Sequence, residues 1–165
     1  MAQTETVTHE LEPYYNENSK VLILGSIPSP KSREQGFYYG HPRNRFWKVL
    51  SDILKEEFPD TVEKRKAMLE AHNIALWDVL SSCEIKGADD SSIRNPHAND
   101  LGIIINKANI SAVFATGKKA ADLYNRYCRS SSGIDVICLP STSPANCSCS
   151  YERLKQEYSI ILNYL

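Results

Sequence analysis

The chain has 165 residues, a length typical of a single domain with a core of its own. Its 42% apolar and 24% charged residues are ordinary for a globular protein, and a net charge of −1 excludes nonspecific coating of polyanions. A local basic face remains open, because residues 31–48 carry five Lys or Arg against one acid, Glu34. The alternative for that stretch is a plain solvated helix face.

No apolar run approaches the roughly 18 residues that a membrane-spanning helix needs, and the polar start of the chain is unlike a signal peptide. Five cysteines, an odd number, argue against a secreted disulfide framework. Their positions also lack the paired short spacings of a zinc or iron–sulfur site. We therefore expect an intracellular protein without metal or cofactor, cytoplasmic in a prokaryote or nuclear in a eukaryote.

The first segment, residues 1–19, is polar and has no sustained period, which predicts a loosely ordered arm before a single domain over residues 20–165. Val21–Gly25 is a continuous apolar run ending in Gly, as expected for a buried strand of a parallel sheet. The Pro- and Ser-rich stretch Ser26–Gln35 then predicts a loop at the carboxyl end of that strand.

A helix is predicted from about Asn44 to near Phe58, because Phe46, Leu50, Ile53 and Leu54 share one helical face. Asn44 occupies the N-cap position, at the positive end of this helix dipole. A second helix is expected to follow it after Asp60 and Glu63, which resemble a capping box.

The second half of the chain alternates between strand and helix patterns. The stretch Ser81–Asn95 has neither pattern and is expected to be irregular, either functional or mobile. Strands are predicted over Ile74–Val79, Ile110–Ala115 and Asp135–Leu139, and helices over 101–108, after Gly117 and from Tyr151 to the C-terminus. This alternation predicts a three-layer α/β/α fold around a mostly parallel four-stranded sheet.

Ligands of such folds bind beyond the carboxyl ends of the strands. The loops Ser26–Asn44 and Pro140–Ser148 leave the first and last predicted strands at that edge, and both are rich in Pro, Ser and Asn. We therefore expect the functional site between these two loops.

Three segments of these loops carry a family resemblance: Gly25-Ser26-Ile27-Pro28-Ser29, the run from Tyr39 to Val49, and Leu139-Pro140-Ser141-Thr142-Ser143-Pro144. Together they resemble the uracil-DNA glycosylase superfamily. The His-Pro-x-Asn-Arg-Phe-Trp segment is similar to the mismatch-specific uracil/thymine glycosylases. The fuller pattern, which includes Tyr-Tyr-Gly-His-Pro-Arg-Asn, is closer to the hypoxanthine-DNA (deoxyinosine) glycosylase family.

The resemblance implies a catalytic role for Asn44. Most branches of the superfamily carry Asp, Asn or Glu, which acts on the attacking water, at the position that Ile27 occupies here. Ile27 cannot hydrogen-bond, and the hypoxanthine family uses a later amide that matches Asn44. An amide does not titrate near neutral pH, so we expect it to position water rather than to remove a proton. The alternative is a plain N-cap.

The resemblance also assigns residues to the base and to the DNA backbone. Tyr39 would stack on the extruded base, for which the alternative is a core tyrosine, and His41 would contact the base or a phosphate or simply brace its loop. Ser143 would grip phosphates in the second motif, for which the alternative is ordinary turn chemistry. Apart from the resemblance, Lys118 opens a helix after Gly117 and is expected to hold a phosphate, for which the alternative is a solvated lysine. The expected base-binding residues are Tyr39, Gly25, Ser26, Ile27, Pro28 and His41, and the expected DNA-binding residues are Ser143, Pro144, Ala145, Asn146, Arg43, Lys31 and Lys118.

The resulting hypothesis is a monofunctional DNA glycosylase of base-excision repair that acts as a monomer and removes hypoxanthine or uracil. One alternative is a mismatch-type uracil glycosylase. The other is a nucleic-acid-binding relative without catalysis, because Ile27 replaces the usual catalytic residue. A dinucleotide-dependent oxidoreductase is disfavoured, since no Gly-x-Gly-x-x-Gly turn follows Val21–Leu24.

Overall fold

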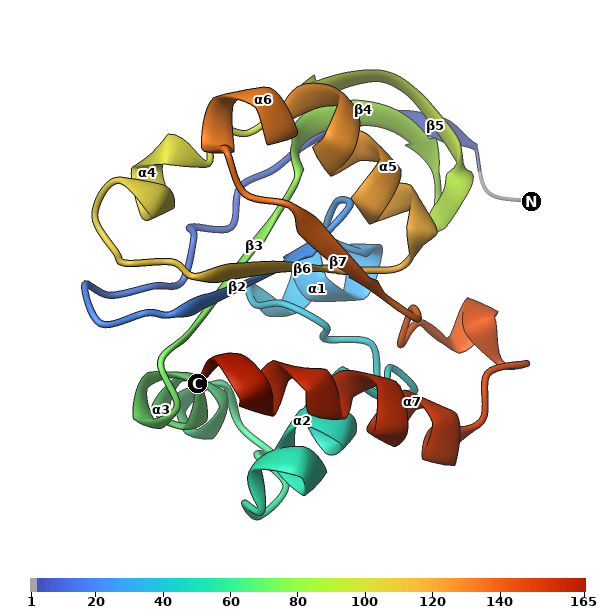
Figure 1. Cartoon of the computed structure of the whole chain (residues 1–165). Coiled ribbons are helices and arrows are strands. Elements are labelled where there is room, and N and C mark those ends of the chain that lie inside the picture. Colours follow the sequence, from blue (N-terminus) through green and yellow to red (C-terminus); the bar gives the residue numbers. More distant parts are fainter. Residues whose placement is uncertain (1–2) are drawn as a thin grey trace.

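The computed structural model describes residues 3–165 and has a four-stranded parallel sheet at its centre (Figure 1). The two inner strands and β3 are buried along their whole length, which explains why their sequences are apolar up to the last residue, where β3 ends in Asp78 and β6 in Thr116. In the register of the sheet, Leu22 lies between Ala75 and Val113. The strand order is β3 (Ile74–Asp78), β2 (Val21–Gly25), β6 (Ala112–Thr116) and β7 (Val136–Leu139).

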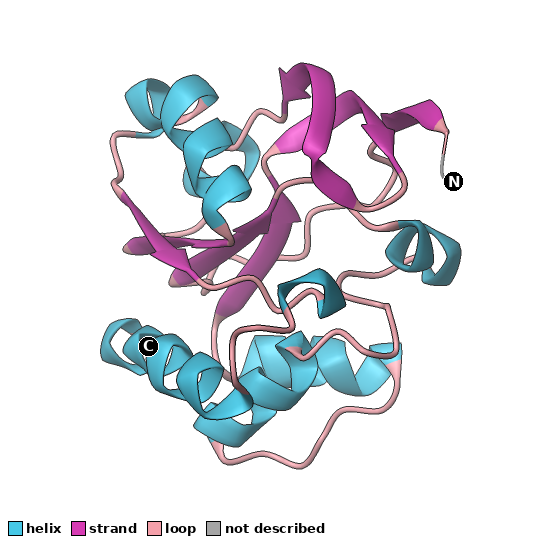
Figure 2. Cartoon of the chain, turned by 90° about the vertical axis from the view of Figure 1, so that its right-hand side faces the viewer, coloured by secondary structure: helices cyan, strands magenta, loops and turns pink. Residues whose placement is uncertain are grey.

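Helices cover both faces of this sheet, which confirms the predicted three-layer α/β/α fold (Figures 1 and 2). One face carries α2 (Phe46–Leu54), α3 (Val62–Ala71) and α7 (Tyr151–Tyr158), and the other carries α4 (Gly102–Ile105), α5 (Lys118–Tyr127) and α6 (Arg129–Ser132). The remaining helical segments are α1 (Pro30–Gln35), which follows β2, and the 3-10 turns η1 (Pro144–Asn146) and η2 (Ser159–Tyr164). Within residues 3–165, no helix is both long and apolar enough to cross a membrane.

Helix α2 is shorter than predicted. It ends at Leu54 rather than near Phe58, because Lys55 adopts a left-handed conformation with φ of 59° and its N–H caps the last turn. Phe58 lies beyond this cap and is 53% exposed. The buried face of α2 is as predicted, with Phe46, Leu50 and Ile53 in the core.

A second, antiparallel sheet corrects the prediction that Ser81–Asn95 is irregular. Strands β4 (Leu80–Lys86) and β5 (Asp89–Ala98) form a hairpin, and β1 (Thr4–Thr8) pairs with the free edge of β4. The turn uses Gly87, which has a φ of 57°. The hairpin buries few side chains, so its sequence carries little strand signal.

The N-terminal segment is also corrected, because part of it is built into the fold rather than loosely ordered. Val7 lies opposite Cys83 in the β1–β4 pairing and is 2% exposed. Further on, the backbone N–H and C=O of Tyr14 exchange hydrogen bonds of 2.9 Å with Leu76 of β3. The partners of both residues lie more than 60 positions away, which is why a local pattern did not reveal them. Residues 1 and 2 lie outside the described part of the chain.

Candidate active site

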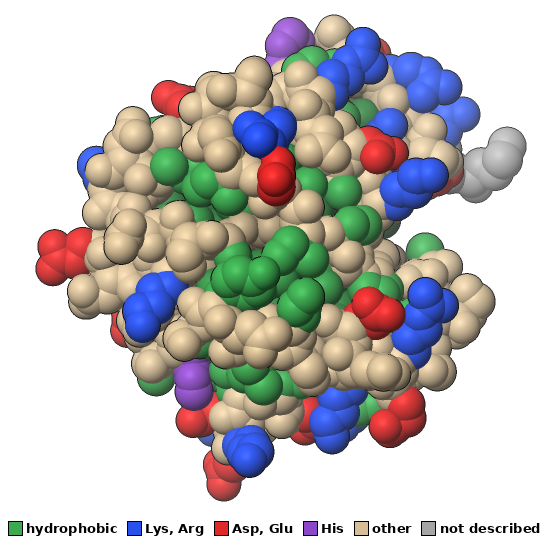
Figure 3. Space-filling view, viewed as in Figure 1, with side chains coloured by type: hydrophobic (Ala, Val, Ile, Leu, Met, Phe, Trp, Pro, Cys, Tyr) green, Lys and Arg blue, Asp and Glu red, His purple; other side chains and the backbone are tan. Residues whose placement is uncertain are grey.

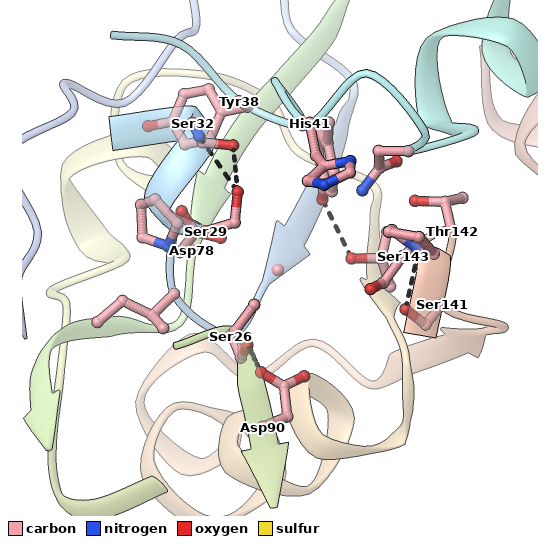
Figure 4. A pocket seen from close by; sticks show the side chains of 18 of the residues that line it. Ser26, Ser29, Ser32, Tyr38, His41, Asp78, Asp90, Ser141, Thr142 and Ser143 are labelled. Atoms are coloured by element: carbon pink, nitrogen blue, oxygen red, sulfur yellow. Dashed lines mark hydrogen bonds between the residues drawn. The ribbon is translucent and has the colours of Figure 1, made fainter. Parts of the chain in front are cut away.

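A cavity of about 130 Å³ lies at the carboxyl edge of the parallel sheet, where β2, β3 and β6 end. Most of its walls come from four segments that are far apart in the chain, residues 25–29, 38–44, 85–90 and 141–144, and Ser32, Asp78 and Thr116 complete them. Figure 4 shows these residues converging on one hollow. The predicted meeting of the first and last loops at this edge is therefore found, and the β4–β5 hairpin adds a wall that the prediction lacked.

Asn44 lines this cavity from the entrance to α2. Its carboxamide Oδ1 accepts the backbone N–H of Phe46 at 2.9 Å, so the side chain takes one of the unpaired donors at the helix start. Arg45, rather than Asn44, is the N-cap residue by position. The hydrogen bond fixes the direction of the amide, and an amide oxygen has a second lone pair that can accept a hydrogen from water.

Tyr39 lines the cavity beside Asn44, and its ring stacks on Phe46 with centroids 3.8 Å apart and planes at 18°. Its hydroxyl pairs with the hydroxyl of Thr116 at 3.1 Å. The backbone of Tyr39 has a φ of 54°, a left-handed conformation that non-glycine residues seldom adopt. Burial raises the pKa of the Tyr39 hydroxyl, so the ring stays neutral. The ring is therefore held rigidly, as a stacking platform requires.

The loop after β2 brings Gly25, Ser26, Ile27 and Pro28 to the cavity, as predicted. Gly25 is required by close packing, because a Cβ at this position would lie 2.5 Å from Oδ1 of Asp78. Ile27 is half-buried and lines the cavity with carbon alone, so this loop offers no side chain to act on water at that position.

Asp78 is a residue that sequence reasoning missed, at the carboxyl end of β3. It is 4% exposed and lines the cavity, and His9 Nε2 lies 2.8 Å from its Oδ2. His9 itself is delivered by the segment after β1, and its side chain is 1% exposed. An Asp that ends a buried parallel strand was the available signal, since ligands bind at that edge.

Asp90 is a second missed residue and stands at the start of β5. Its Oδ1 accepts the hydroxyl of Ser26 at 2.8 Å, and both side chains line the cavity (Figure 4). Burial raises the pKa of Asp90 above its ordinary value, although the hydrogen bond from Ser26 opposes that shift. No local signal in the sequence points to Asp90, because the stretch around it has neither a helix nor a strand pattern.

His41 lines the cavity next to Asn44, and its Nδ1 accepts the backbone N–H of Arg43 at 3.1 Å. This contact braces the loop and leaves Nε2 for other partners. Arg43 itself is exposed and does not line the cavity. Both readings of His41, as a brace and as a ligand contact, are compatible with this position.

The second loop forms the opposite wall. Ser143 and Pro144 line the cavity, whereas Ala145 and Asn146 line an adjoining groove of about 570 Å³ together with Lys118. The Ser143 hydroxyl accepts the N–H of Ala145 at 3.2 Å, so it caps the turn η1. The predicted DNA-binding residues of this loop are therefore split between the cavity and the groove beside it.

Most side chains of the predicted cationic cluster form ion pairs or hydrogen bonds within the protein. Lys31, Arg33 and Lys48 pair with the carboxylates of Glu34, Glu5 and Asp52. Arg45 instead donates to the carbonyl oxygens of Cys149 at 2.7 Å and Asn146 at 3.1 Å. On the face seen in Figure 3, basic side chains gather at the upper right, over β5 and α5, among scattered acids. Lys31 does not line the cavity, and residues 31–48 do not form a free basic face.

Among residues 3–165, no three His, Cys, Asp or Glu side chains are grouped so that they could hold a metal ion.

Comparison with known proteins places this site in a family. The profile of the uracil DNA glycosylase superfamily matches residues 12–165. A hypoxanthine DNA glycosylase of Methanosarcina barkeri is 35% identical over 81% of this chain and 85% of its own length. A hypoxanthine DNA glycosylase of Methanosarcina acetivorans is 35% identical over 79% of this chain and 83% of its own.

A solved structure supports the same assignment. The solution NMR structure of a candidate uracil DNA glycosylase from Methanosarcina acetivorans superimposes with a TM-score of 0.81 and 29% identity, over 97% of this chain and 99% of that one. The fold, the cavity and these relatives together define a DNA glycosylase. The chain belongs to the uracil DNA glycosylase superfamily.

Proposed function

We propose that this glycosylase removes deaminated bases from DNA, hypoxanthine first and uracil second, as the opening step of base-excision repair. Two relatives at 35% identity are named hypoxanthine DNA glycosylase, which supports hypoxanthine as the main substrate. Both bases share a lactam edge, a carbonyl beside an N–H. One pocket can therefore accept either.

The observation that carries this proposal is the position of Asn44. It lines the cavity with its amide held in place by the Phe46 N–H at 2.9 Å, whereas Ile27 leaves the first loop without a polar side chain at its position. In the proposed reaction the free lone pair of Oδ1 orients a water toward C1′ of the sugar. Because an amide cannot take up a proton near neutral pH, the contribution of Asn44 is positioning.

The extruded base is proposed to stack on Tyr39, with Phe46 behind the ring at 3.8 Å. Backbone groups of the Ser26–Pro28 loop and the Asp78 carboxylate would then face its lactam edge. A carboxylate oxygen accepts the N–H of hypoxanthine or uracil, whereas adenine and cytosine present a lone pair at the corresponding ring nitrogen. This contact would favour deaminated bases.

The duplex is proposed to lie across the cavity mouth, with Ser143 to Asn146 entering the gap left by the flipped nucleotide. Flipping costs a few kcal/mol and is cheapest for a mispaired base such as hypoxanthine. The residues that line the cavity include no lysine, which supports water as the nucleophile and a monofunctional enzyme. All five cysteines are unpaired, as expected for the proposed intracellular location. We further propose that the protein acts as a monomer.

The test is a base-release assay on duplexes that contain one inosine, uracil or xanthine, run with the wild type, Asn44→Ala and the control Asn163→Ala, the same change at an exposed position that lines neither the cavity nor the groove. We expect release from inosine above uracil. We also expect a loss of about 100-fold in Asn44→Ala with DNA binding retained, since removal of one such positioned group typically costs 10²–10³ in rate. Asn163→Ala should cleave at the wild-type rate.

Other outcomes identify the alternatives. Uracil released faster than inosine would indicate a mismatch-type uracil glycosylase. No release from any of these duplexes by the wild type, with DNA still bound, would indicate a binding protein without catalysis. Full activity of Asn44→Ala would remove the water-positioning role and leave Asn44 as a helix cap.

A further inference from the structure

We propose that Asp90 is the general acid that protonates N7 of the departing purine, so that hypoxanthine leaves as a neutral molecule. This inference deepens the proposed function and depends on it. It gives the β4–β5 hairpin a catalytic side chain.

The position of Asp90 is the first argument. The hairpin turn brings Gly87, Ala88 and Asp90 to the cavity wall, and Figure 4 shows Asp90 beside Ser26, on the side of the hollow away from His41. Oδ1 is held by the Ser26 hydroxyl at 2.8 Å. Oδ2 has no hydrogen-bond partner in the described part of the chain. One carboxyl oxygen is thus fixed by the loop proposed to read the base, and the other is available to carry a proton.

The charge of the cavity is the second argument. Its lining residues include two carboxyl groups, Asp78 and Asp90, and neither lysine nor arginine. A base that departs as an anion gains nothing from such surroundings, because like charges in a poorly solvated site repel strongly. A purine can avoid this repulsion, because protonation of N7 as the glycosidic bond breaks lets the base leave without a charge. Uracil has no equivalent ring nitrogen.

The surroundings of Asp90 favour its protonated form. Burial, the nearby carboxylate of Asp78 on β3 and Asp89 beside it on β5 raise the pKa of Asp90. Lys119 on α5 and the hydroxyl of Ser26 act in the opposite direction. Burial is the largest of these effects, and a carboxyl group with a raised pKa is a suitable general acid at neutral pH.

The chemical step balances as follows. The Asp90 carboxyl gives its proton to N7 while the C1′–N9 bond breaks and its electron pair stays on the base. Water held at Asn44 adds its oxygen to C1′. The proton that this water loses passes to solvent or returns to the Asp90 carboxylate. The products are neutral hypoxanthine and an abasic sugar, and one water is consumed.

The experiment pairs a change in the enzyme with a change in the substrate. Single-turnover release is measured for the wild type, Asp90→Asn and the control Asp89→Asn, which makes the same side-chain change at the adjacent, exposed position. The substrates are duplexes with deoxyinosine, deoxyuridine or 7-deaza-2′-deoxyinosine, in which a C–H replaces N7. Asp90→Asn should lose about 10²–10⁴-fold on deoxyinosine, the usual contribution of a general acid. It should lose nothing on deoxyuridine or on the 7-deaza substrate.

The pH profile gives an independent readout. Release from deoxyinosine by the wild type should decrease as the pH rises through the pKa of Asp90, whereas release from deoxyuridine should not. Equal losses of Asp90→Asn on deoxyinosine and 7-deaza-2′-deoxyinosine would overturn the role at N7, and so would unchanged release from deoxyinosine. Those results would not contradict the proposal that the protein releases hypoxanthine. If the wild type releases no hypoxanthine, the proposed function fails and the inference fails with it.

Discussion

The guanidinium of Arg45 donates a hydrogen bond of 2.7 Å to the carbonyl oxygen of Cys149, a residue 104 positions further along the chain. The same side chain reaches the carbonyl of Asn146, and the Arg45 backbone N–H donates to Thr142 at 3.1 Å. Arg45 follows Asn44 directly. One side chain therefore joins the segment of Asn44, the proposed water-positioning residue, to the loop that is proposed to enter the DNA.

Arg45→Met should loosen the loop over residues 141–149. It removes two hydrogen bonds from a charged donor, each worth about 1.5–3 kcal/mol, so we expect a clear decrease in the free energy of unfolding. We also expect faster amide hydrogen exchange over residues 141–149 and a higher KM for duplex DNA. Arg126→Met, at an exposed position that lines neither the cavity nor the groove, is the control. Unchanged exchange in Arg45→Met would contradict this account.

Two substitutions of Tyr39 distinguish the effect of its stacking surface from that of its hydrogen bond. Tyr39→Phe removes only the 3.1 Å contact with Thr116 and should cost about 1 kcal/mol of stability with near-normal base release. Tyr39→Leu removes the stacking surface, worth about 1–3 kcal/mol per base, and should lower kcat/KM by about 10- to 100-fold. Urea unfolding and single-turnover kinetics measure the two effects. Equal activity of the two variants would argue against a stacked base.

Gly25→Ala should destabilise the protein through Asp78. The added Cβ would lie 2.5 Å from a buried carboxylate oxygen, and overpacking of this kind costs about 1–3 kcal/mol. Base release should also decrease, because the carboxylate must move. In a background carrying Asp78→Ser, which shortens that side chain, Gly25→Ala should cost less. The same cost in both backgrounds would show that the strain lies elsewhere.

Asp90→Asn should stabilise the protein at neutral pH. Burial raises the pKa of Asp90 in the folded state, so the folded protein holds this proton more tightly than the unfolded chain does. The stability that this proton confers is present at low pH. It is lost as the pH rises from about 4, the ordinary Asp value, through the folded-state pKa. Thermal unfolding should show a higher Tm for Asp90→Asn at pH 7 and no gain near pH 4. A lower Tm of Asp90→Asn than of the wild type at pH 7 would contradict the predicted stabilisation.

Lys118 and Lys31 should differ in their effect on DNA affinity. Lys118 is exposed and borders the groove beside the cavity, whereas Lys31 pairs with Glu34 at 3.3 Å and does not line the cavity. Lys118→Ala should therefore weaken binding and reduce the slope of log affinity against log salt by about 1, the loss of one phosphate contact. Lys31→Ala should leave the slope unchanged. Fluorescence anisotropy over a salt series measures both.

The parallel sheet could be predicted because its strands are buried on both faces. Val21–Gly25 and the stretch from Ile74 to Trp77 are apolar without interruption, and such runs are visible in a single sequence. The hairpin could not be predicted in this way. Along β4 and β5 only a few residues, such as Cys83, Ile85 and Ile93, are buried, and β1 contributes Val7. Strands of this kind depend on partners far away in the chain.

The site residues also divide into those that local sequence motifs predict and those that depend on distant parts of the chain. Asn44, Tyr39 and the loop after β2 were found from local motifs, and they do line the cavity. Asp78, Asp90 and His9 were missed. The roles of Asp90 and His9 depend on the placement of the hairpin and of the N-terminal strand, and Asp78 is recognisable only once its strand is known to end at the cavity. The expected basic cluster was wrong because the number of cations in a sequence says nothing about which carboxylates will pair with them.

His9, Asn44, Asp78 and Pro144 come from almost the full length of the chain and meet around one small cavity or directly behind it. During synthesis, the segment that carries Pro144 is made after the other three. A nascent or prematurely terminated product therefore has no competent site. Base release should therefore require all four segments, and a chain that stops before Pro144 should show none.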